Sequence, residues 1–359
     1  READLIEEVA RIHGLDRLPA TLPARRRAVG RMRPAQRVRR RLEDALRDRG
    51  LNEVVAYSFT SASALDRLRL DHAGALEIRN PLSEEGSVMR PLLLPGLLDA
   101  ARLNAAHGRP GLRLFESAHV YSAAAGGDAG DGSGPVQVIE AAPRGARPAR
   151  EPHHLAGLLT EAAPATWRSE GRSADFYAAR GLVEVLLAIA GIEWSAEPGA
   201  RPFLHPGRSA TVRAFAGGRA LGWIGEVHPL VAREWEVPPA AAFELDADAI
   251  AELAPDRGED GYRDLTSFPA VVQDIAVVVE EGVSAARVEA SVRAGAGDLL
   301  SAVRIFDLYR GEQLGPGRKS LALRLEFRAP DRTLTDAEVA ARRSEIETAI
   351  AEIGGALRA

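Results

Sequence analysis

The sequence contains no cysteine, so neither a disulfide framework nor a thiolate metal site can form. This absence is compatible with a reducing compartment, and nothing in the sequence requires export. No apolar run approaches the roughly 20 residues that a membrane-spanning helix needs. The chain opens without methionine or a signal-peptide pattern, and its helical pattern begins at residue 3. We therefore expect the sequence to be a piece cut inside a domain.

An excess of positive charge is also lacking. The 46 basic residues are outnumbered by 51 acidic ones, which gives a formal net charge of −5. A uniformly basic nucleic-acid binder is thus disfavoured, and any RNA contact must come from local patches. Arginines gather between Arg25 and Arg41, and two interpretations stay open there. They form either a surface that tracks a phosphate backbone or a solvated linker with the exposed face of a helix.

The chain has 359 residues, of which 46 % are hydrophobic, so it is long enough for two or three globular domains. Periodicity predicts helices over 3–13, 34–50, 97–107 and 175–191. Short strands are predicted at 54–59, 76–78, 112–116, 155–159, 211–215, 220–225 and 243–245, with a hairpin turn at Gly217-Gly218. Such strands, spaced between few helices, indicate an antiparallel α+β domain rather than a doubly wound one. Residues 123–135 are nearly all Ala, Gly, Asp and Ser, which favours a flexible surface loop.

The organisation changes from about Thr266 onward. Strands are predicted at 274–280, 303–309 and 320–328, with helices at 284–294 and after Thr335. Thr335 is followed three residues later by Glu338, which is a capping box. The order β-α-β-β-α-β predicts a ferredoxin-like domain.

Three carboxylates share one face of the first helix, because Asp4, Glu7 and Glu8 are spaced i, i+3 and i+4. Such a cluster suits a hard cation that prefers oxygen ligands, such as Mg²⁺. The competing interpretation is an acidic first turn, which the helix dipole favours in any case.

Two histidines, His205 and His228, each precede a proline, which predicts that they lie at turns or strand ends. Their separation fits no local zinc spacing, so a turn histidine bonded to backbone is the favoured interpretation. An alternative is a stand-alone enzyme that uses His205, Glu226 and His228. We find no Gly-rich phosphate loop and no nucleophile elbow in the sequence.

Aromatic and basic residues gather near a Gly/Pro loop in the last domain. Tyr309, Arg310, Arg318 and Lys319 flank this loop beside a predicted strand. They are the materials for base stacking and phosphate contacts, which predicts an RNA contact there. For Phe306 and Phe327, on the neighbouring strands, the competing interpretation is that they are simply core residues.

Several strings, taken together and in order, resemble bacterial phenylalanyl-tRNA synthetase β subunits. They are ADLIEEVARI at 3–12, NPLS at 80–83, MRPLLLPGL at 89–97, LFE at 114–116, HPGRSA at 205–210, IGEVHP at 224–229, FEL at 243–245, SFPAVVQD at 267–274 and DRTLTD at 331–336. Any one string is weak evidence, but the ordered set covers essentially the whole chain. The chain is similar to the C-terminal portion of such a subunit.

The resemblance implies a domain organisation. Residues 1–18 would be the last helix of a truncated small domain, and residues 19–33 a linker. Residues 34–252 would form a class II synthetase-like core that has lost its chemistry, and residues 266–359 a ferredoxin-fold anticodon-binding domain. The editing domain and an N-terminal tRNA-binding domain would lie upstream.

The resemblance also implies a function and partners. The chain would bind tRNA(Phe) and scaffold a cytoplasmic α₂β₂ heterotetramer, in which the α subunit binds ATP and phenylalanine and performs the catalysis. Asp4, Glu7 and Glu8 match Mg²⁺ ligands of the family, with a further aspartate ligand upstream. An alternative that stays open is a purely structural subunit that contacts RNA little.

Overall fold

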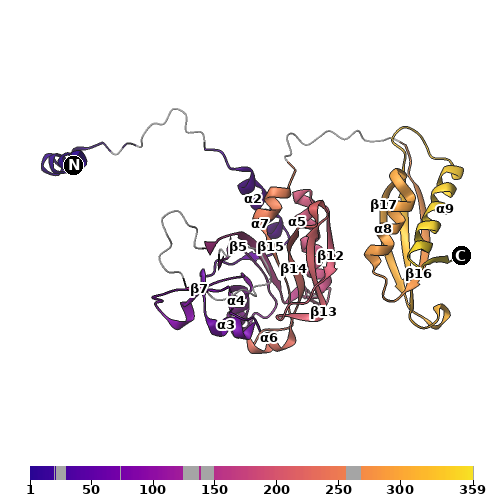
Figure 1. Cartoon of the computed structure of the whole chain (residues 1–359), viewed down its shortest axis with the longest axis horizontal. Helices are drawn as coiled ribbons and strands as arrows, with labels where there is room; N and C mark the ends of the chain where they lie inside the picture. The colour runs from indigo at the N-terminus through magenta and orange to yellow at the C-terminus, as the bar shows by residue number, and fades with distance from the viewer. Residues whose placement is uncertain are drawn as a thin grey trace. The chain divides into compact units, whose positions relative to one another are not determined.

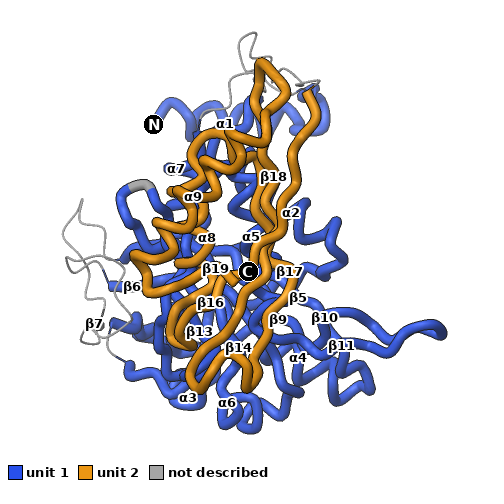
Figure 2. The backbone as a smooth tube through the Cα atoms, turned by 90° about the vertical axis from the view of Figure 1, so that its right-hand side faces the viewer, with its two compact units in different colours: residues 1–256 blue, residues 257–359 orange. Residues whose placement is uncertain are grey.

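The structure is a computed structural model that describes residues 1–19, 21, 30–72, 74–123, 137–138, 149–255 and 268–358 (Figure 1). The chain divides into two compact units, residues 1–256 and 257–359 (Figure 2). Arg25, Arg26 and Arg27 and all but the first residue of the predicted loop 123–135 lie outside the described residues. None of the described helices is long and apolar enough to cross a membrane.

Unit 1 is built around a seven-stranded sheet with the order β1-β5-β9-β15-β14-β13-β12. Its strands are β1 Asn52–Glu53, β5 Arg113–His119, β9 His153–Leu159, β12 Trp194–Pro198, β13 Leu204–Ala214, β14 Ala220–Val227 and β15 Ala241–Asp246. Only β1 and β5 pair in parallel; the other neighbours are antiparallel. The predicted antiparallel α+β class is therefore confirmed, as is the hairpin turn between β13 and β14.

Both faces of this sheet are covered. On one face lie α2 (Pro34–Asp48), α5 (Phe176–Ala190) and α7 (Ala247–Leu253), which meet Leu155 and Leu159 of β9 (Figure 1). On the other face lie α3 (Ala62–Arg67), α4 (Leu94–Ala106) and α6 (Pro229–Glu234), which meet Ala156 and Leu158. This division follows from the two-residue period of a strand, which sends neighbouring side chains to opposite faces.

Smaller elements complete unit 1. Strands β2 (Phe59–Thr60), β4 (Val88–Met89), β3 (Leu76–Glu77) and β7 (Gln137–Val138) form one small sheet; β6 (Ser122–Ala123) pairs with β8 (Ala149–Arg150), and β10 (Glu161–Ala163) with β11 (Arg172–Ser173). The first helix, α1, spans Glu2–His13. Short 3₁₀ turns lie at Leu15–Arg17, Glu84–Gly86 and Ala216–Gly218.

The predicted buried strand at 54–59 is wrong. Val55 and Tyr57 are 91 % and 85 % exposed, and only Phe59, at the end of the segment, lies in a strand. The reason lies in the hydrogen bonds of this backbone. The Ala56 amide donates to the Glu116 carboxylate and the Tyr57 carbonyl accepts from Arg90, so side chains replace a strand ladder.

Unit 2 has the ferredoxin-like order that the sequence predicts. Its elements are β16 (Val271–Glu280), α8 (Ala285–Ala296), β17 (Leu300–Tyr309), β18 (Arg318–Phe327), α9 (Asp336–Glu352) and β19 (Ala356–Arg358), with 3₁₀ turns at Gly297–Leu299 and Glu312–Leu314. The four strands have the order β17-β18-β16-β19. Helices α8 and α9 pack together on one side of the strands, as the orange tube in Figure 2 shows. The predicted capping box of Thr335 and Glu338 is present.

Candidate nucleic-acid interface

One face of the unit 2 sheet is open to solvent. Ile275, Val277 and Leu323 point into the core beneath α8 and α9. The alternate positions Asp274, on β16, and Arg304, on β17, both pair in register with Arg324 on β18. Because strand side chains alternate, these three residues lie on the opposite face, which we call the open face.

The open face carries a fixed pair of an aromatic ring and a guanidinium group. The Arg324 guanidinium carbon lies 5.4 Å from the centroid of the Phe306 ring, and Phe306 is 51 % exposed. Arg324 also donates through Nε and Nη2 to the two Asp274 oxygens, at 2.8 Å each. This bidentate bond lowers the pKa of Asp274 and raises the pKa of Arg324. The result is a pre-oriented flat surface of the kind on which an unstacked base can lie.

Tyr309 extends the open face toward one end of the sheet. It pairs in register with Ser320 and is 40 % exposed. Its hydroxyl lies against Gly311 so closely that a Cβ there would collide with it. A glycine at position 311 is therefore needed for the Tyr309 ring to lie where it does.

The other three predicted RNA-contact residues lie at the same end of the sheet. Arg310 Nη2 donates to Glu281 Oε1 at 2.7 Å, and Lys319 Nζ donates to the Glu281 carbonyl at 2.7 Å. The Arg310 bond lowers the pKa of Glu281. Arg318 is exposed and pairs in register with Glu280. The structure thus brings the four residues together, although Glu281 offsets part of their charge, and their RNA role stays a prediction.

Sequence reasoning missed Arg304, Phe306 and Arg324. Phe327 is a core residue as interpreted, being fully buried, but the interpretation of Phe306 as core is wrong. Phe306 alternates with Val303 and Ile305, which pack against the core, so it lies on the open face with Arg304. The register shift between Ile305 and Asp307 instead brings Tyr309 to the same face. One signal was available, because Val303 and Ile305 alternate as core positions, which places Phe306 on the opposite face.

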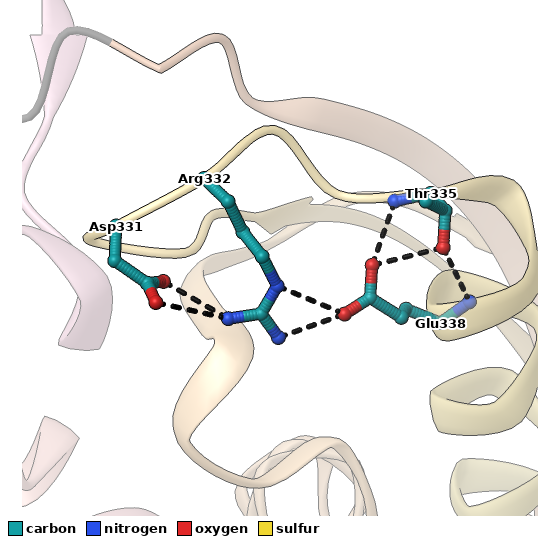
Figure 3. A network of polar contacts seen from close by, with 4 residues as sticks. All are labelled: Asp331, Arg332, Thr335 and Glu338. Carbon is teal, nitrogen blue, oxygen red and sulfur yellow. Dashed lines mark hydrogen bonds and ion pairs between the residues drawn. The ribbon is translucent and has the colours of Figure 1, made fainter.

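A polar network fixes the loop that leads into α9 (Figure 3). The Glu338 carboxylate accepts from the Thr335 amide at 2.9 Å and from Arg332 Nη2 at 2.8 Å, while Arg332 Nη1 also donates to Asp331 at 2.9 Å. The amide bond from Thr335, with the bonds from Arg332 and the Thr335 hydroxyl, lowers the pKa of Glu338 to about 2. This network is structural, since its bonds run in a chain from Asp331 through Arg332 and Glu338 to Thr335.

In unit 1, two buried carboxylates flank Ala156 on neighbouring strands. Glu116 accepts from Arg90 Nη1 at 2.7 Å and from the Ala56 amide at 3.1 Å. Glu244 accepts from His154 Nδ1 at 2.7 Å and from the Leu93 amide at 3.0 Å. Burial lowers the pKa of His154, but its bond to Glu244 and the charge of Glu244 more than offset this, so that pKa is raised. Both carboxylates therefore hold loops and α4 to the sheet.

The favoured interpretation of His205 and His228 is confirmed. Each accepts a backbone amide bond at Nδ1 from the residue two positions on, Gly207 and Leu230, at 3.1 Å in both cases. Glu226 accepts from Arg208 Nε at 2.6 Å instead of from either histidine. These bonds leave Glu226 engaged with an arginine rather than poised as the base of an enzyme site.

The three predicted metal ligands lie on the exposed helix α1. Asp4 is bonded to the Arg1 amine at 2.8 Å and Glu8 to Arg11 at 2.6 Å. Across the described part of the chain, no group of three or more acidic or histidine side chains is placed to hold a metal ion. Asp4, Glu7 and Glu8 therefore do not complete a metal centre here, and the Mg²⁺ site stays a prediction.

The ferredoxin-like unit indicates the class of protein. Residues 266–358 match the family model described as the ferredoxin-fold anticodon binding domain. An anticodon-binding domain of this kind places the chain in the class of aminoacyl-tRNA synthetases.

The core indicates the family. Residues 18–247 match the model described as the phenylalanyl tRNA synthetase beta chain CLM domain, and the chain belongs to this family. The phenylalanine–tRNA ligase beta subunit of Moorella thermoacetica is 41 % identical over 99 % of this chain and 42 % of its own length. That of Geobacillus kaustophilus is 37 % identical over 99 % and 42 %. The resemblance seen in the sequence is confirmed.

The chain spans about two fifths of the length of the curated relatives it matches. Among solved structures, a pyrrolysyl-tRNA synthetase, PylSc, of Desulfitobacterium hafniense aligns with a TM-score of 0.40 and 16 % identity, over 69 % of this chain and 71 % of that one.

Proposed function

We propose that the chain acts as the non-catalytic portion of a cytoplasmic phenylalanine–tRNA ligase. Unit 2 binds the anticodon end of tRNA(Phe), and unit 1 packs against an α subunit that binds ATP and phenylalanine, in an α₂β₂ assembly. Family membership supports this proposal, as does the internal use of the buried carboxylates Glu116 and Glu244. The contribution to aminoacylation is then orientation of the tRNA.

The open face of unit 2 is the observation that carries the tRNA-binding proposal. Sequence-specific RNA binders favour single-stranded loops, whose splayed bases stack on aromatic and guanidinium planes. Phe306, braced by Arg324, and Tyr309 supply such planes on one sheet face. Arg304 adds a cation beside them, in register with Arg324.

The test is binding of a fluorescent anticodon stem-loop of tRNA(Phe), followed by anisotropy over a range of salt concentrations. Stacking contributes about 1–3 kcal/mol per base, so Phe306→Ala should weaken binding by about tenfold. Arg324→Gln should weaken it and reduce the salt slope by about one if the guanidinium contacts phosphate. Arg342→Gln is the matched control. It removes the same charge from α9, which covers the face of the sheet opposite the open face. Unchanged binding by Phe306→Ala, or equal losses in Arg342→Gln, would contradict the assignment.

The basic residues at the end of the sheet, which the sequence predicts to contact RNA, are tested separately. Charge reversal at Arg310, Arg318 and Lys319 should weaken tRNA binding and flatten its salt dependence. Arg318→Glu is the cleanest of the three, because Arg310 and Lys319 also hold Glu281. A salt slope equal to that of the unchanged protein would remove these residues from the interface.

Deletion of residues 266–359 separates the tRNA role from the scaffold role. Unit 2 has its own core, which includes Val277, Leu323 and Ile346, so its removal should leave unit 1 folded. Loss of tRNA binding with retained α-subunit capture is the expected result. Retained tRNA binding would favour the purely structural subunit.

We also infer that Asp4, Glu7 and Glu8 contribute to a Mg²⁺ site that is completed by a further aspartate of the full subunit. Family resemblance supports this inference, together with the exposure of these side chains on α1. Calorimetric titration with Mg²⁺ should show binding to the full subunit that Glu7→Gln weakens. Equal binding by the variant would remove Glu7 from the site.

A further inference from the structure

A cluster of cationic and histidine side chains lies at one end of the unit 1 sheet. His205 and His228 are neighbours across β13 and β14, where Leu204 pairs with Val227 and the His228 amide donates to the Phe203 carbonyl at 2.8 Å. Arg69, in the turn after α3, lies with Nη1 3.2 Å from His228 Nε2. Arg69 holds a left-handed backbone conformation, φ 61, that is uncommon for a residue other than glycine.

Backbone contacts assign the position of the proton on each ring. Nδ1 of His228 meets the Leu230 amide and Nε2 meets Arg69; both partners are donors, and a neutral ring can accept at only one nitrogen. The amide belongs to the first turn of α6, and His205 makes the same contact with the Gly207 amide, so we assign the acceptor to Nδ1. The neutral ring then carries its proton on Nε2. The same reasoning, with the Gly207 amide, places the His205 proton on Nε2.

This assignment creates a conflict between His228 and Arg69. Nε2–H of His228 is a donor, and the Arg69 guanidinium has only donors, so the 3.2 Å approach is no hydrogen bond between them. Two donors that face each other need an acceptor that both can reach. A water molecule could satisfy their geometry, but it leaves the positive charge of Arg69 uncompensated.

Electrostatics at the cluster favours an anion. Burial lowers the pKa of His228 most, and the electrostatic effects of Arg69 and His205 lower it further. The nearest carboxylate on β14, Glu226, is paired with Arg208. A bound anion would offset the positive charge that these groups concentrate.

We propose that Arg69, His228 and His205 form a binding site for a phosphate-type oxyanion, which supplies the acceptor that the facing donors of Arg69 and His228 lack. A tetrahedral phosphate offers separate oxygens to a guanidinium and to two imidazole N–H groups, whereas a carboxylate offers only two oxygens. The same chemistry is present in free phosphate and in an RNA phosphodiester. The site lies in unit 1, and the inference does not rest on tRNA binding by unit 2.

The experiment uses the full chain, in which all eight histidines are labelled with ¹⁵N. Ring ¹H–¹⁵N spectra report both the tautomer and the pKa of each imidazole during titration with inorganic phosphate. His205 and His228 should show the Nε2–H tautomer and shift saturably with phosphate, and His228 should titrate at higher pH when phosphate is bound. Arg69→Gln should weaken phosphate binding by about tenfold, since hydrogen bonds to charged groups contribute about 1.5–3 kcal/mol. Arg102→Gln, on α4, removes an equal charge and should change nothing.

Two further ligands identify the source of the oxyanion. A short single-stranded RNA that displaces phosphate points to a phosphodiester, and saturable phosphate binding that RNA leaves unchanged points to free phosphate. Acetate that saturates the same resonances at the same concentration would overturn the assignment to phosphate. So would an Nδ1–H tautomer at His228, the absence of a saturable shift, or equal weakening in Arg102→Gln.

Discussion

Removal of the Glu116 carboxylate should destabilise unit 1 strongly. Arg90 and Glu116 form a buried ion pair of 2.7 Å, with side chains only 5 % and 2 % exposed. Truncation in Glu116→Ala leaves the Arg90 charge buried without its partner and leaves the Ala56 amide without its acceptor. Breaking a buried pair in this way costs about 3–5 kcal/mol.

Two companion variants separate charge from packing. Glu116→Gln keeps an oxygen for Arg90 and Ala56 and should cost less than Glu116→Ala. The double variant Arg90→Met with Glu116→Leu removes both charges and should be no worse than Glu116→Ala, because paired apolar replacements are often neutral. It still leaves the His119 and Tyr57 carbonyls without the Arg90 donor, which limits its recovery.

Tryptophan fluorescence during urea unfolding is the assay, since all four tryptophans, Trp167, Trp194, Trp223 and Trp235, lie in unit 1. Unit 2 therefore contributes no tryptophan signal, and the unit 1 transition is followed by itself. Glu184→Ala is the control, because its pair with Arg180 is exposed and should contribute at most about 1 kcal/mol. A loss below about 1 kcal/mol in Glu116→Ala, or a loss equal to that of Glu184→Ala, would refute the reasoning.

Two further predictions concern pH. The pKa of His154 is raised in the folded protein by Glu244. The contribution of His154 to unit 1 stability is therefore full below about pH 6.5 and is lost as pH rises through the higher native pKa. Urea unfolding at several pH values should show this loss of stability, and His154→Gln should abolish the pH dependence. The pKa of Glu338 is depressed to about 2, so its contribution to unit 2 is present above about pH 4.5 and is lost as pH falls toward 2. The protection factors of amides at the start of α9, which compare each exchange rate with the intrinsic rate at the same pH, should fall over that acid range. Thr335→Ala, which removes the N-cap, should cost about 1 kcal/mol. Protection factors that are unchanged between pH 5 and pH 2 would contradict the second prediction.

The ferredoxin-like unit was predictable because its signals are local. The clean alternation of 320–328 and the capping box at Thr335 each concern residues close in sequence, and the structure has both. The segment 54–59 shows the opposite case. Its apolar residues resemble a strand, but the hydrogen bonds that decide its conformation come from Arg90 and Glu116, far away in sequence.

The candidate site also has a part that local sequence predicts and a part that depends on tertiary contacts. Tyr309 and its basic neighbours were found because they are adjacent in sequence or flank one loop. Phe306 alternates with the core-facing Val303 and Ile305, whereas only the bulge after Ile305 brings Tyr309 to the same open face. The pair of Phe306 with Arg324 joins two strands, so only their register reveals it.

By itself, the sequence determined the α+β class, the ferredoxin-like order of the last unit, the turn role of His205 and His228, and the family. These rest on hydrophobic period, capping residues, proline geometry and ordered motifs, all of which act over a few residues. Only the tertiary structure decided that Glu116 and Glu244 are engaged in buried bonds, that unit 2 has an open aromatic face, and that Arg69 lies against His228. Each of these depends on residues that are distant in the chain, because burial and charge are set by what the fold brings into contact.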